Sequence, residues 1–233
     1  TKGILTINII IIKLLMSLVN KQRIPQGYYL GVNPKDRLLI NDILETTKLD
    51  EFQQVGVIEL GSGKGYISRI ISSHYKIPIF CVDSIRERLA SSMRVQQLIN
   101  DDKVLEYANK AAGTFNMFNY QNEIRSRDDF LEIWYQAMAL QQFKEVKTVV
   151  ILGVKLCGDF FYNMVDWIAE TRALMEGFRV EIVVVPCCLH KSIRSINLDP
   201  VQEMARYAHT LSDRVDVLPT TSSSYKIIRF KLS

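Results

Sequence analysis

A glycine-rich segment that follows a short apolar run most constrains the fold of this chain. Residues 55–60 are apolar enough for a buried strand, and the next five residues read Gly-Ser-Gly-Lys-Gly. Glycines at alternating positions allow a tight backbone turn and a close approach to a ligand. A second apolar run, residues 77–82, is followed by Asp83. Between the two runs, apolar residues recur at the spacing of a helix; they are Tyr66, Ile67, Ile70 and Ile71. The pattern predicts a strand, a ligand-binding loop, a helix and a second strand.

The rest of the chain alternates between strand-like and helix-like patterns, least clearly over residues 101–145. Strands that alternate with helices form mostly parallel sheets covered on both faces. The sequence therefore predicts an α/β fold, a Rossmann-like seven-stranded, mostly parallel sheet with helices on both faces. We expect the further strands at residues 114–120, 148–154, 179–185, 215–218 and 226–232, and helices around residues 38–44, 128–142, 160–175 and 200–211.

Three kinds of nucleotide-binding loop compete for the glycine segment. A P-loop requires G-x-x-x-x-G-K-[ST], but Ile58 takes the first glycine position and Gly65 the last position. A G-x-G-x-x-G fingerprint that starts at Gly61 requires a glycine where Tyr66 stands. The arrangement E-x-G-x-G-x-G of residues 59–65 instead resembles motif I of class I S-adenosylmethionine-dependent methyltransferases. A glycine-rich turn without a ligand is the remaining alternative.

This resemblance implies S-adenosylmethionine as the cofactor. In that family the loop packs against the methionine part, the first acidic residue interacts near its amino group, and the acidic residue that ends the second strand binds the ribose hydroxyls. Asp83 stands about 20 residues after the first glycine, where a ribose-binding carboxylate is expected. Ser84 is also predicted to cap the next helix, because Glu87 completes a capping box. The expected cofactor-binding residues are Glu59, Gly61, Ser62, Gly63, Gly65, Asp83 and Ser84.

Two further motifs follow the predicted fourth and fifth strands. They are Gly-Val-Lys-Leu-Cys-Gly-Asp at residues 153–159 and Pro-Cys-Cys-Leu-His-Lys at residues 186–191. Ligands of open parallel sheets bind beyond the carboxyl ends of the strands. The two motifs are therefore expected to bring Lys155, Cys157, Cys188 and His190 towards the methyl donor.

The same motifs resemble those of eukaryotic tRNA acceptor-stem ribose 2′-O-methyltransferases, which carry Leu-Cys-Gly and Cys-Cys-x-His segments at these places. Residues 31–35, Gly-Val-Asn-Pro-Lys, and the Cys-Gly-Asp of residues 157–159 resemble a related methyltransferase-like family that includes ribosomal-RNA-adenine-dimethylase-domain-containing proteins. The resemblance covers roughly residues 31–190. It implies methyl transfer to RNA, with the tRNA ribose 2′-hydroxyl as the favoured acceptor.

Several interpretations of the candidate catalytic residues, Lys155, Cys157 and His190, stay open at this point. Lys155 or His190 is suited to assist as a base or as an electrostatic stabiliser of a ribose hydroxyl that loses its proton. Alternatively, Cys157 and Cys187 or Cys188 stand where enzymes that methylate cytosine C5 place nucleophilic cysteines. A further alternative is that Cys157 and His190 have only a structural role. The last is that they bind a zinc ion together with Cys188.

A second function is a catalytically silent methyltransferase-like module that binds RNA or takes part in ribosome assembly. Val154 and Leu189 motivate this alternative, because the resembling family has polar residues at these positions.

Charge and cysteine usage set limits on partners and location. The net charge of +4 permits an acidic partner such as RNA without requiring one. The four cysteines form no CxxC pair, which argues against a zinc finger or a disulfide framework. We expect an intracellular location, cytoplasmic or nuclear, and the sequence leaves the oligomeric state open.

The first 19 residues differ from the rest of the chain. Residues 4–19 are strongly apolar but contain Lys13, and the run is shorter than a convincing membrane-spanning helix. No signal-peptide cleavage site follows before Lys21. We interpret residues 1–19 as an apolar leader whose role is open between a non-native extension, a docked segment and an anchor. Residues 20–233 are predicted to form a single methyltransferase domain, without stable membrane association.

Overall fold

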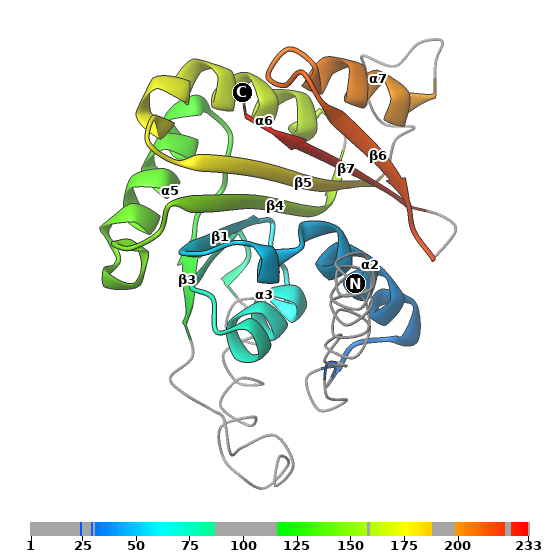
Figure 1. The fold of residues 1–233 in the computed structure, drawn as a ribbon, viewed down its shortest axis with the longest axis horizontal. Helices are drawn as coiled ribbons and strands as arrows, with labels where there is room; N and C mark the ends of the chain where they lie inside the picture. The colour runs from blue at the N-terminus through cyan, green and yellow to red at the C-terminus, as the bar shows by residue number, and fades with distance from the viewer. Residues whose placement is uncertain are drawn as a thin grey trace, which may run out of the picture.

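The computed structural model describes residues 24, 29, 31–86, 116–157, 159–187, 199–221 and 225–232. Within these residues seven strands form one sheet in the order β3-β2-β1-β4-β5-β7-β6 (Figure 1). The strands are β1 (Val55–Leu60), β2 (Ile79–Asp83), β3 (Met117–Gln121), β4 (Thr148–Cys157), β5 (Arg179–Cys187), β6 (Val215–Pro219) and β7 (Lys226–Lys231).

Strands β1 to β5 pair in parallel, whereas β7 is antiparallel to both β5 and β6. This arrangement confirms the predicted Rossmann-like, mostly parallel sheet of seven strands. The predicted leader, residues 1–19, lies outside the described residues. No helix in the described part of the chain has the length and apolar character that crossing a membrane requires.

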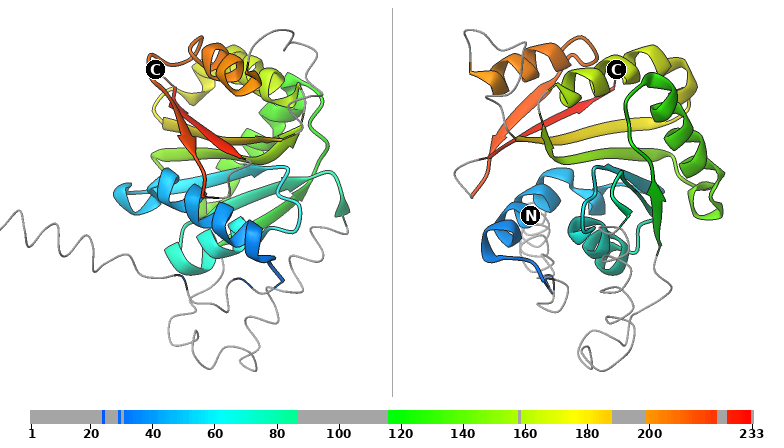
Figure 2. Two further views of the ribbon diagram at one scale, coloured as in Figure 1. Left: turned by 90° about the vertical axis from the view of Figure 1, so that its right-hand side faces the viewer. Right: turned by 180° about the vertical axis from the view of Figure 1, so that it is seen from behind.

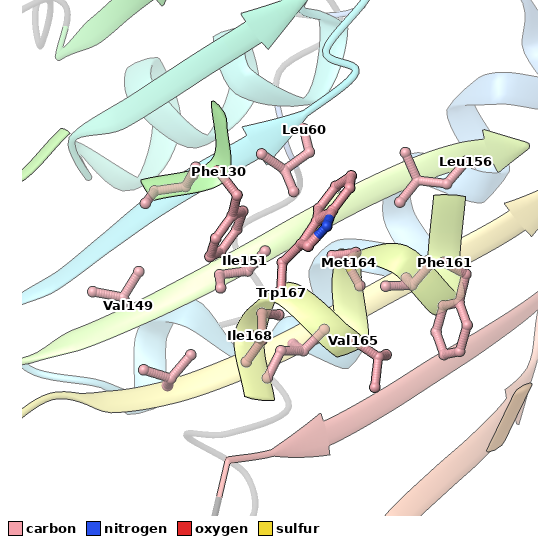
Figure 3. Packing of buried hydrophobic residues seen from close by; sticks show 14 of the residues in the cluster. Leu60, Phe130, Val149, Ile151, Leu156, Phe161, Met164, Val165, Trp167 and Ile168 are labelled. Atoms are coloured by element: carbon pink, nitrogen blue, oxygen red, sulfur yellow. The ribbon is translucent and has the colours of Figure 1, made fainter. Parts of the chain in front are cut away.

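Helices cover both faces of the sheet, as the views in Figure 2 show. One face packs against α5 (Arg127–Ala139), α6 (Phe160–Thr171) and α7 (Pro200–Ala208), and the other against α2 (Pro34–Thr47) and α3 (Tyr66–Ile70). On the first face Phe130 of α5 and Trp167 of α6 lie over Ile151 of β4 (Figure 3). Strands β1 and β2 are buried on both faces, which explains their nearly continuous apolar sequences.

Helices α2, α5 and α7 begin at residues whose side chains satisfy free backbone N–H groups. Asn33 caps α2 by accepting a hydrogen bond from the Asp36 backbone nitrogen at 2.8 Å, with proline at the first helical position. Ser126 and Asp129 form a capping box at the start of α5. Asp199 caps α7, again directly before a proline.

Strands β4 and β5 extend beyond the predicted ends, Val154 and Val185. Their pairing continues through Leu156 opposite Pro186, so the predicted loop motifs begin inside the sheet. The reason is the packing of Leu156, which is 7% exposed and covers Gly153. A Cβ at Gly153 would lie 2.3 Å from Leu156 Cδ1, so this glycine provides space within a strand and does not make a turn.

Helices α5 and α6 end earlier than predicted, and each is followed by a turn of a different helical type. α5 is followed by a 3-10 turn over Gln141–Phe143, and α6 by one over Arg172–Met175. α3 continues as a π-helical turn over Ile71–Tyr75.

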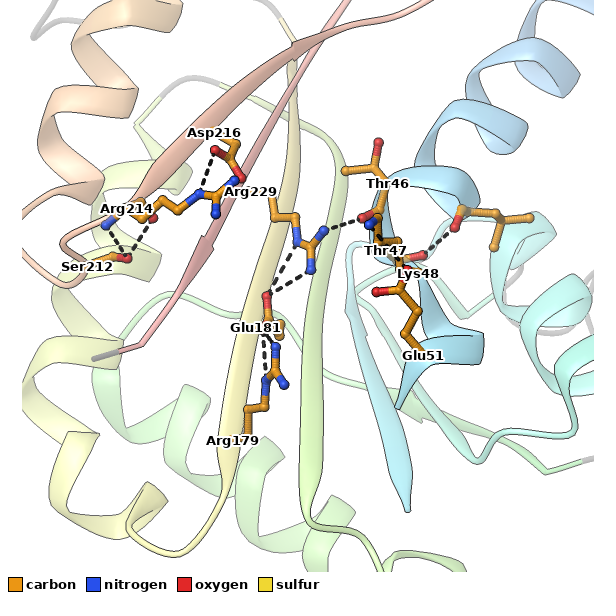
Figure 4. A network of polar contacts seen from close by, with 11 residues as sticks. Thr46, Thr47, Lys48, Glu51, Arg179, Glu181, Ser212, Arg214, Asp216 and Arg229 are labelled. Atoms are coloured by element: carbon orange, nitrogen blue, oxygen red, sulfur yellow. Dashed lines mark hydrogen bonds and ion pairs between the residues drawn. The ribbon is translucent and has the colours of Figure 1, made fainter. Parts of the chain in front are cut away.

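An arginine and glutamate network joins α2 to the antiparallel edge of the sheet (Figure 4). Arg229 of β7 donates to the Thr46 carbonyl oxygen of α2 at 2.8 Å and to Glu181 of β5 at 3.4 Å. Arg179 binds the other oxygen of Glu181 at 2.6 Å. The buried glutamate therefore has two guanidinium partners, and the network fixes α2 relative to β5 and β7.

Candidate active site

The glycine loop leaves the carboxyl end of β1 and runs directly into α3. Gly61, Gly63 and Gly65 have φ angles of 68°, 58° and 62°, a left-handed conformation that favours glycine. The Ser62 amide donates to the Val82 carbonyl oxygen at 2.9 Å, so the loop is tied to β2. Gly65 is the residue directly before the first turn of α3.

Asp83 connects the loop to the end of β2. Its carboxylate accepts from the Gly63 amide at 2.8 Å and from the Ile85 amide at 2.8 Å, and the residue is 5% exposed. Because an ionised carboxylate can accept several hydrogen bonds, anchoring the loop is compatible with binding a ribose hydroxyl. Ser84, the next residue, is exposed, and Glu87 of its predicted capping box lies outside the described residues.

Glu59 is a buried carboxyl group at the base of the loop. It is 3% exposed and accepts a hydrogen bond from the Ser68 hydroxyl of α3. Burial raises the pKa of Glu59 to about 7; the Ser68 bonds oppose the rise and the charge of Asp83 adds to it. A cationic ligand group beside this carboxyl would favour its ionised form.

Glu59 and the loop residues Gly61, Ser62 and Gly63 line a cavity of about 280 Å³, near the lower end of the range for small-molecule sites. Asp83 does not line it but is bonded to its wall through the Gly63 amide. Ser62 lines the cavity, and the Ser62 hydroxyl is buried and has no hydrogen-bond partner among the described residues. A buried, unpaired polar atom is unfavourable unless a ligand or water satisfies it. The lining comprises Asp36, Leu39, Ile40, Glu59, Gly61, Ser62, Gly63, Tyr66, Ile67, Val154 and Lys155.

Lys155 is the predicted catalytic residue that reaches this cavity. Its ammonium lies 2.6 Å from an Asp36 carboxylate oxygen and 5.7 Å from the centre of the Tyr225 ring. Burial lowers the pKa of Lys155, but the hydrogen bond and charge of Asp36 outweigh this effect and leave the pKa above its usual value of 10.5. Lys155 therefore stays protonated at neutral pH, which suits an electrostatic stabiliser and is unfavourable for a general base.

The other candidate catalytic residues are less completely described. Cys157 ends β4 opposite Cys187, but its side chain lies outside the described part, as do Cys188 and His190. The Cys187 thiol donates to the Lys155 carbonyl oxygen at 2.9 Å. The nucleophile and zinc interpretations therefore stay predictions, and the described residues contain no cluster of three or more metal-binding side chains.

Sequence reasoning missed three residues of the site: Asp36, Ser68 and Tyr225. Ser68 had a recognisable signal, because it is a small polar residue beside the buried isoleucines of α3. Asp36 looked like an ordinary first-turn acidic residue after an Asn-Pro helix start. Tyr225 lies directly before β7 and gave no signal in the sequence.

Comparisons with known proteins locate this arrangement within a family. No curated protein sequence matches the chain. Among solved structures, a SAM-dependent methyltransferase from Aquifex aeolicus is similar, with 12% identity, coverage of 90% of this chain and 98% of that chain, and a TM-score of 0.49. An RNA methyltransferase from Salinibacter ruber in complex with S-adenosyl-L-homocysteine is similar, with 15% identity, coverage of 86% and 92%, and a TM-score of 0.43. These values are too low to support a conclusion about the substrate.

The match to a family model is more informative. A model described as "Methyltransferase domain" matches residues 37–194, more than half of the chain. The matched range contains β1 to β5, the glycine loop, Asp83 and Lys155. The chain therefore belongs to the methyltransferase domain family and is an S-adenosylmethionine-dependent methyltransferase domain.

Proposed function

We propose that this chain methylates RNA, with a tRNA ribose 2′-hydroxyl as the favoured acceptor, in an intracellular compartment. The observation that carries the proposal is that Lys155 lines the same cavity as the glycine loop, with its ammonium bound to Asp36, another residue of that cavity. The resemblance of the Leu-Cys-Gly and Cys-Cys-Leu-His segments to tRNA ribose methyltransferases supports the acceptor class. We further propose that residues 20–233 act as one domain.

In this proposal the cofactor occupies the cavity with its methionine end against the glycine loop. Glu59 is assigned to the α-amino group, the Ser62 hydroxyl to a polar atom of the cofactor, and Asp83, with Ser84 beside it, to the ribose hydroxyls. The fit is supported by the buried carboxyl, the unpaired hydroxyl and the left-handed glycines. When bound, the cofactor supplies an activated methyl group.

The acceptor chemistry requires a stabiliser of negative charge. A 2′-hydroxyl that attacks a methyl group loses its proton, and its oxygen gains negative charge in the transition state. A fixed ammonium in a partly desolvated site stabilises such a charge, and correct positioning lowers the barrier further. We assign the stabiliser role to Lys155 and keep His190 as the proposed base, with Cys157 as the alternative nucleophile.

Exposed basic residues adjacent in sequence to residues of the site fit a polyanionic acceptor. Lys35 precedes the cavity residue Asp36, Lys64 follows the cavity residue Gly63, and both lysines are exposed. Arg86, close to Asp83, is exposed as well. Lysine and arginine side chains bind RNA phosphates by charge, so this contribution to binding should weaken with added salt.

Labelled methyl transfer tests the proposal. The full chain is incubated with S-adenosylmethionine carrying a labelled methyl group and with total tRNA or rRNA, and the product is digested to nucleosides. We expect label in a 2′-O-methylated nucleoside from the tRNA fraction, and loss of that label in the Lys155→Met variant. Label in neither RNA, with cofactor binding intact, would contradict the RNA assignment.

A silent RNA-binding module is the second candidate. Val154 favours it, because this apolar residue lines the cavity at a position where the resembling tRNA methyltransferases have a polar residue. The same experiment separates the candidates: cofactor and RNA binding without methyl transfer would support the silent module.

A further inference from the structure

A bulge in β4 turns Lys155 towards the cofactor cavity. Ile151 packs against the α5–α6 face of the sheet, whereas Leu152 packs against the α2–α3 face, as expected for a strand. Continued alternation would place Lys155 on the α5–α6 face. The register shifts between Val154 and Leu156, and Leu156 packs on the α5–α6 face instead. The extra residue, Lys155, therefore points towards α2, and such bulges re-aim side chains next to active sites.

The bulged conformation is one that lysine adopts only when its surroundings hold it. Lys155 has a φ of 58°, in the left-handed region where a Cβ is unfavourable. Its carbonyl oxygen accepts from the Cys187 thiol at 2.9 Å, and its ammonium binds Asp36 at 2.6 Å. Contacts at both the backbone and the side chain thus favour this one arrangement.

Asp36 is itself held in place, so it can act as a fixed partner. Its backbone amide donates to the Asn33 side-chain oxygen, and the Asn33 amide group donates to one Asp36 carboxylate oxygen. The other carboxylate oxygen accepts from Lys155. The helix that carries Asp36 is joined to β7 at its far end through Arg229.

We propose that Asp36 is a positioning residue for methyl transfer, which it promotes by holding the Lys155 ammonium in the wall of the cofactor cavity. The proposal rests on the function proposed above. Asp36 acts through Lys155 and is not assigned a contact with the acceptor. Without the carboxylate, the lysine side chain has exposed space into which to rotate, because it is already 42% exposed.

Amine labelling tests the contact without any need for catalysis. The full chain is treated with acetic anhydride at pH 8, and modification of Lys155 is followed by mass spectrometry in the wild type, Asp36→Asn and a matched control, Asp50→Asn. Asp50 lies in the 3-10 turn after α2 and makes no contact with Lys155 that the structure records. We expect Lys155 of Asp36→Asn to react about two- to fivefold faster, the range for a partly exposed ion pair. Equal rates in all three proteins would overturn the proposal.

Kinetics separate a positioning role from a structural one. We expect Asp36→Asn to lower kcat for labelled methyl transfer to tRNA about tenfold, with KM for RNA and affinity for S-adenosylmethionine changed less than about twofold. Lys155→Met and the double variant should be equally impaired, because Asp36 acts through the lysine. Additive losses, or an unchanged kcat in Asp36→Asn, would overturn the proposal. Inactivity of the wild type on RNA would instead contradict the proposed function, while the labelling result still tests the ion pair.

Discussion

Replacement of Glu59 by glutamine removes a buried ionisable group while keeping its shape and its hydrogen bond. The Ser68 hydroxyl, which donates to Glu59, can donate equally to a glutamine side-chain oxygen. Burial raises the pKa of Glu59 from 4.5 to about 7 in the folded chain. We expect the substitution to remove a specific part of the pH dependence of unfolding in the absence of cofactor.

The sign follows from the direction of the shift. Between about pH 4.5 and 7 the folded state binds more protons at Glu59 than the unfolded state does. The wild type therefore has its full stability from this group below about pH 4.5 and loses it as the pH rises through 7. Each pH unit between the two pKa values is worth about 1.4 kcal/mol. The full loss is therefore about 3 kcal/mol, as an order of magnitude.

Urea unfolding at several pH values from 5 to 8 measures this effect. The difference in unfolding free energy between wild type and Glu59→Gln cancels the titration of all other groups. We expect that difference to move by about 2–3 kcal/mol against the wild type as the pH rises across this range. Parallel stability curves would refute the claim that Glu59 is buried with a raised pKa.

Three further predictions concern the cofactor site. Binding of S-adenosylmethionine at pH 6.5 should make the Glu59 carboxyl release a proton, because the cationic amino group beside it favours its ionised form; calorimetric enthalpies should therefore differ between buffers of different ionisation enthalpy, and identical enthalpies would contradict this placement. Gly63→Ala should cost about 1–2 kcal/mol in urea unfolding because of its left-handed φ alone, since an added Cβ meets nothing within 4 Å, and no measurable cost would be inconsistent with this backbone. Asp83→Ala should cost about 1–3 kcal/mol through the lost amide partners and should weaken S-adenosylhomocysteine binding at least tenfold; unchanged affinity would argue against the ribose assignment.

The succession of strand, loop, helix and strand around the cofactor loop could be predicted because its signals are local. The apolar run before Gly61, the alternating glycines and Asp83 at the end of the next strand lie within one short stretch of sequence. The apolar run predicts a buried strand, the glycines predict a tight turn, and Asp83 is a carboxylate at the end of a strand. The structure places Glu59, Ser62 and Gly63 in one cavity and bonds Asp83 to the loop.

The acceptor side of the site could not be predicted because it depends on contacts between distant residues. Asp36 and Lys155 are 119 positions apart, and nothing near either residue indicates the other. The bulge at Lys155 follows from how Leu156 packs over Gly153, which sequence alternation does not encode. The strand was therefore predicted to end at Val154, although β4 continues to Cys157.

Calorimetric titration of the full chain with S-adenosylmethionine and S-adenosylhomocysteine tests the central claim most directly. We expect one site with micromolar affinity for both molecules, and weaker binding in Asp83→Ala under the same conditions. Absence of heat and of competition for either molecule, with a folded protein, would contradict the assignment of this cavity to a methyl donor.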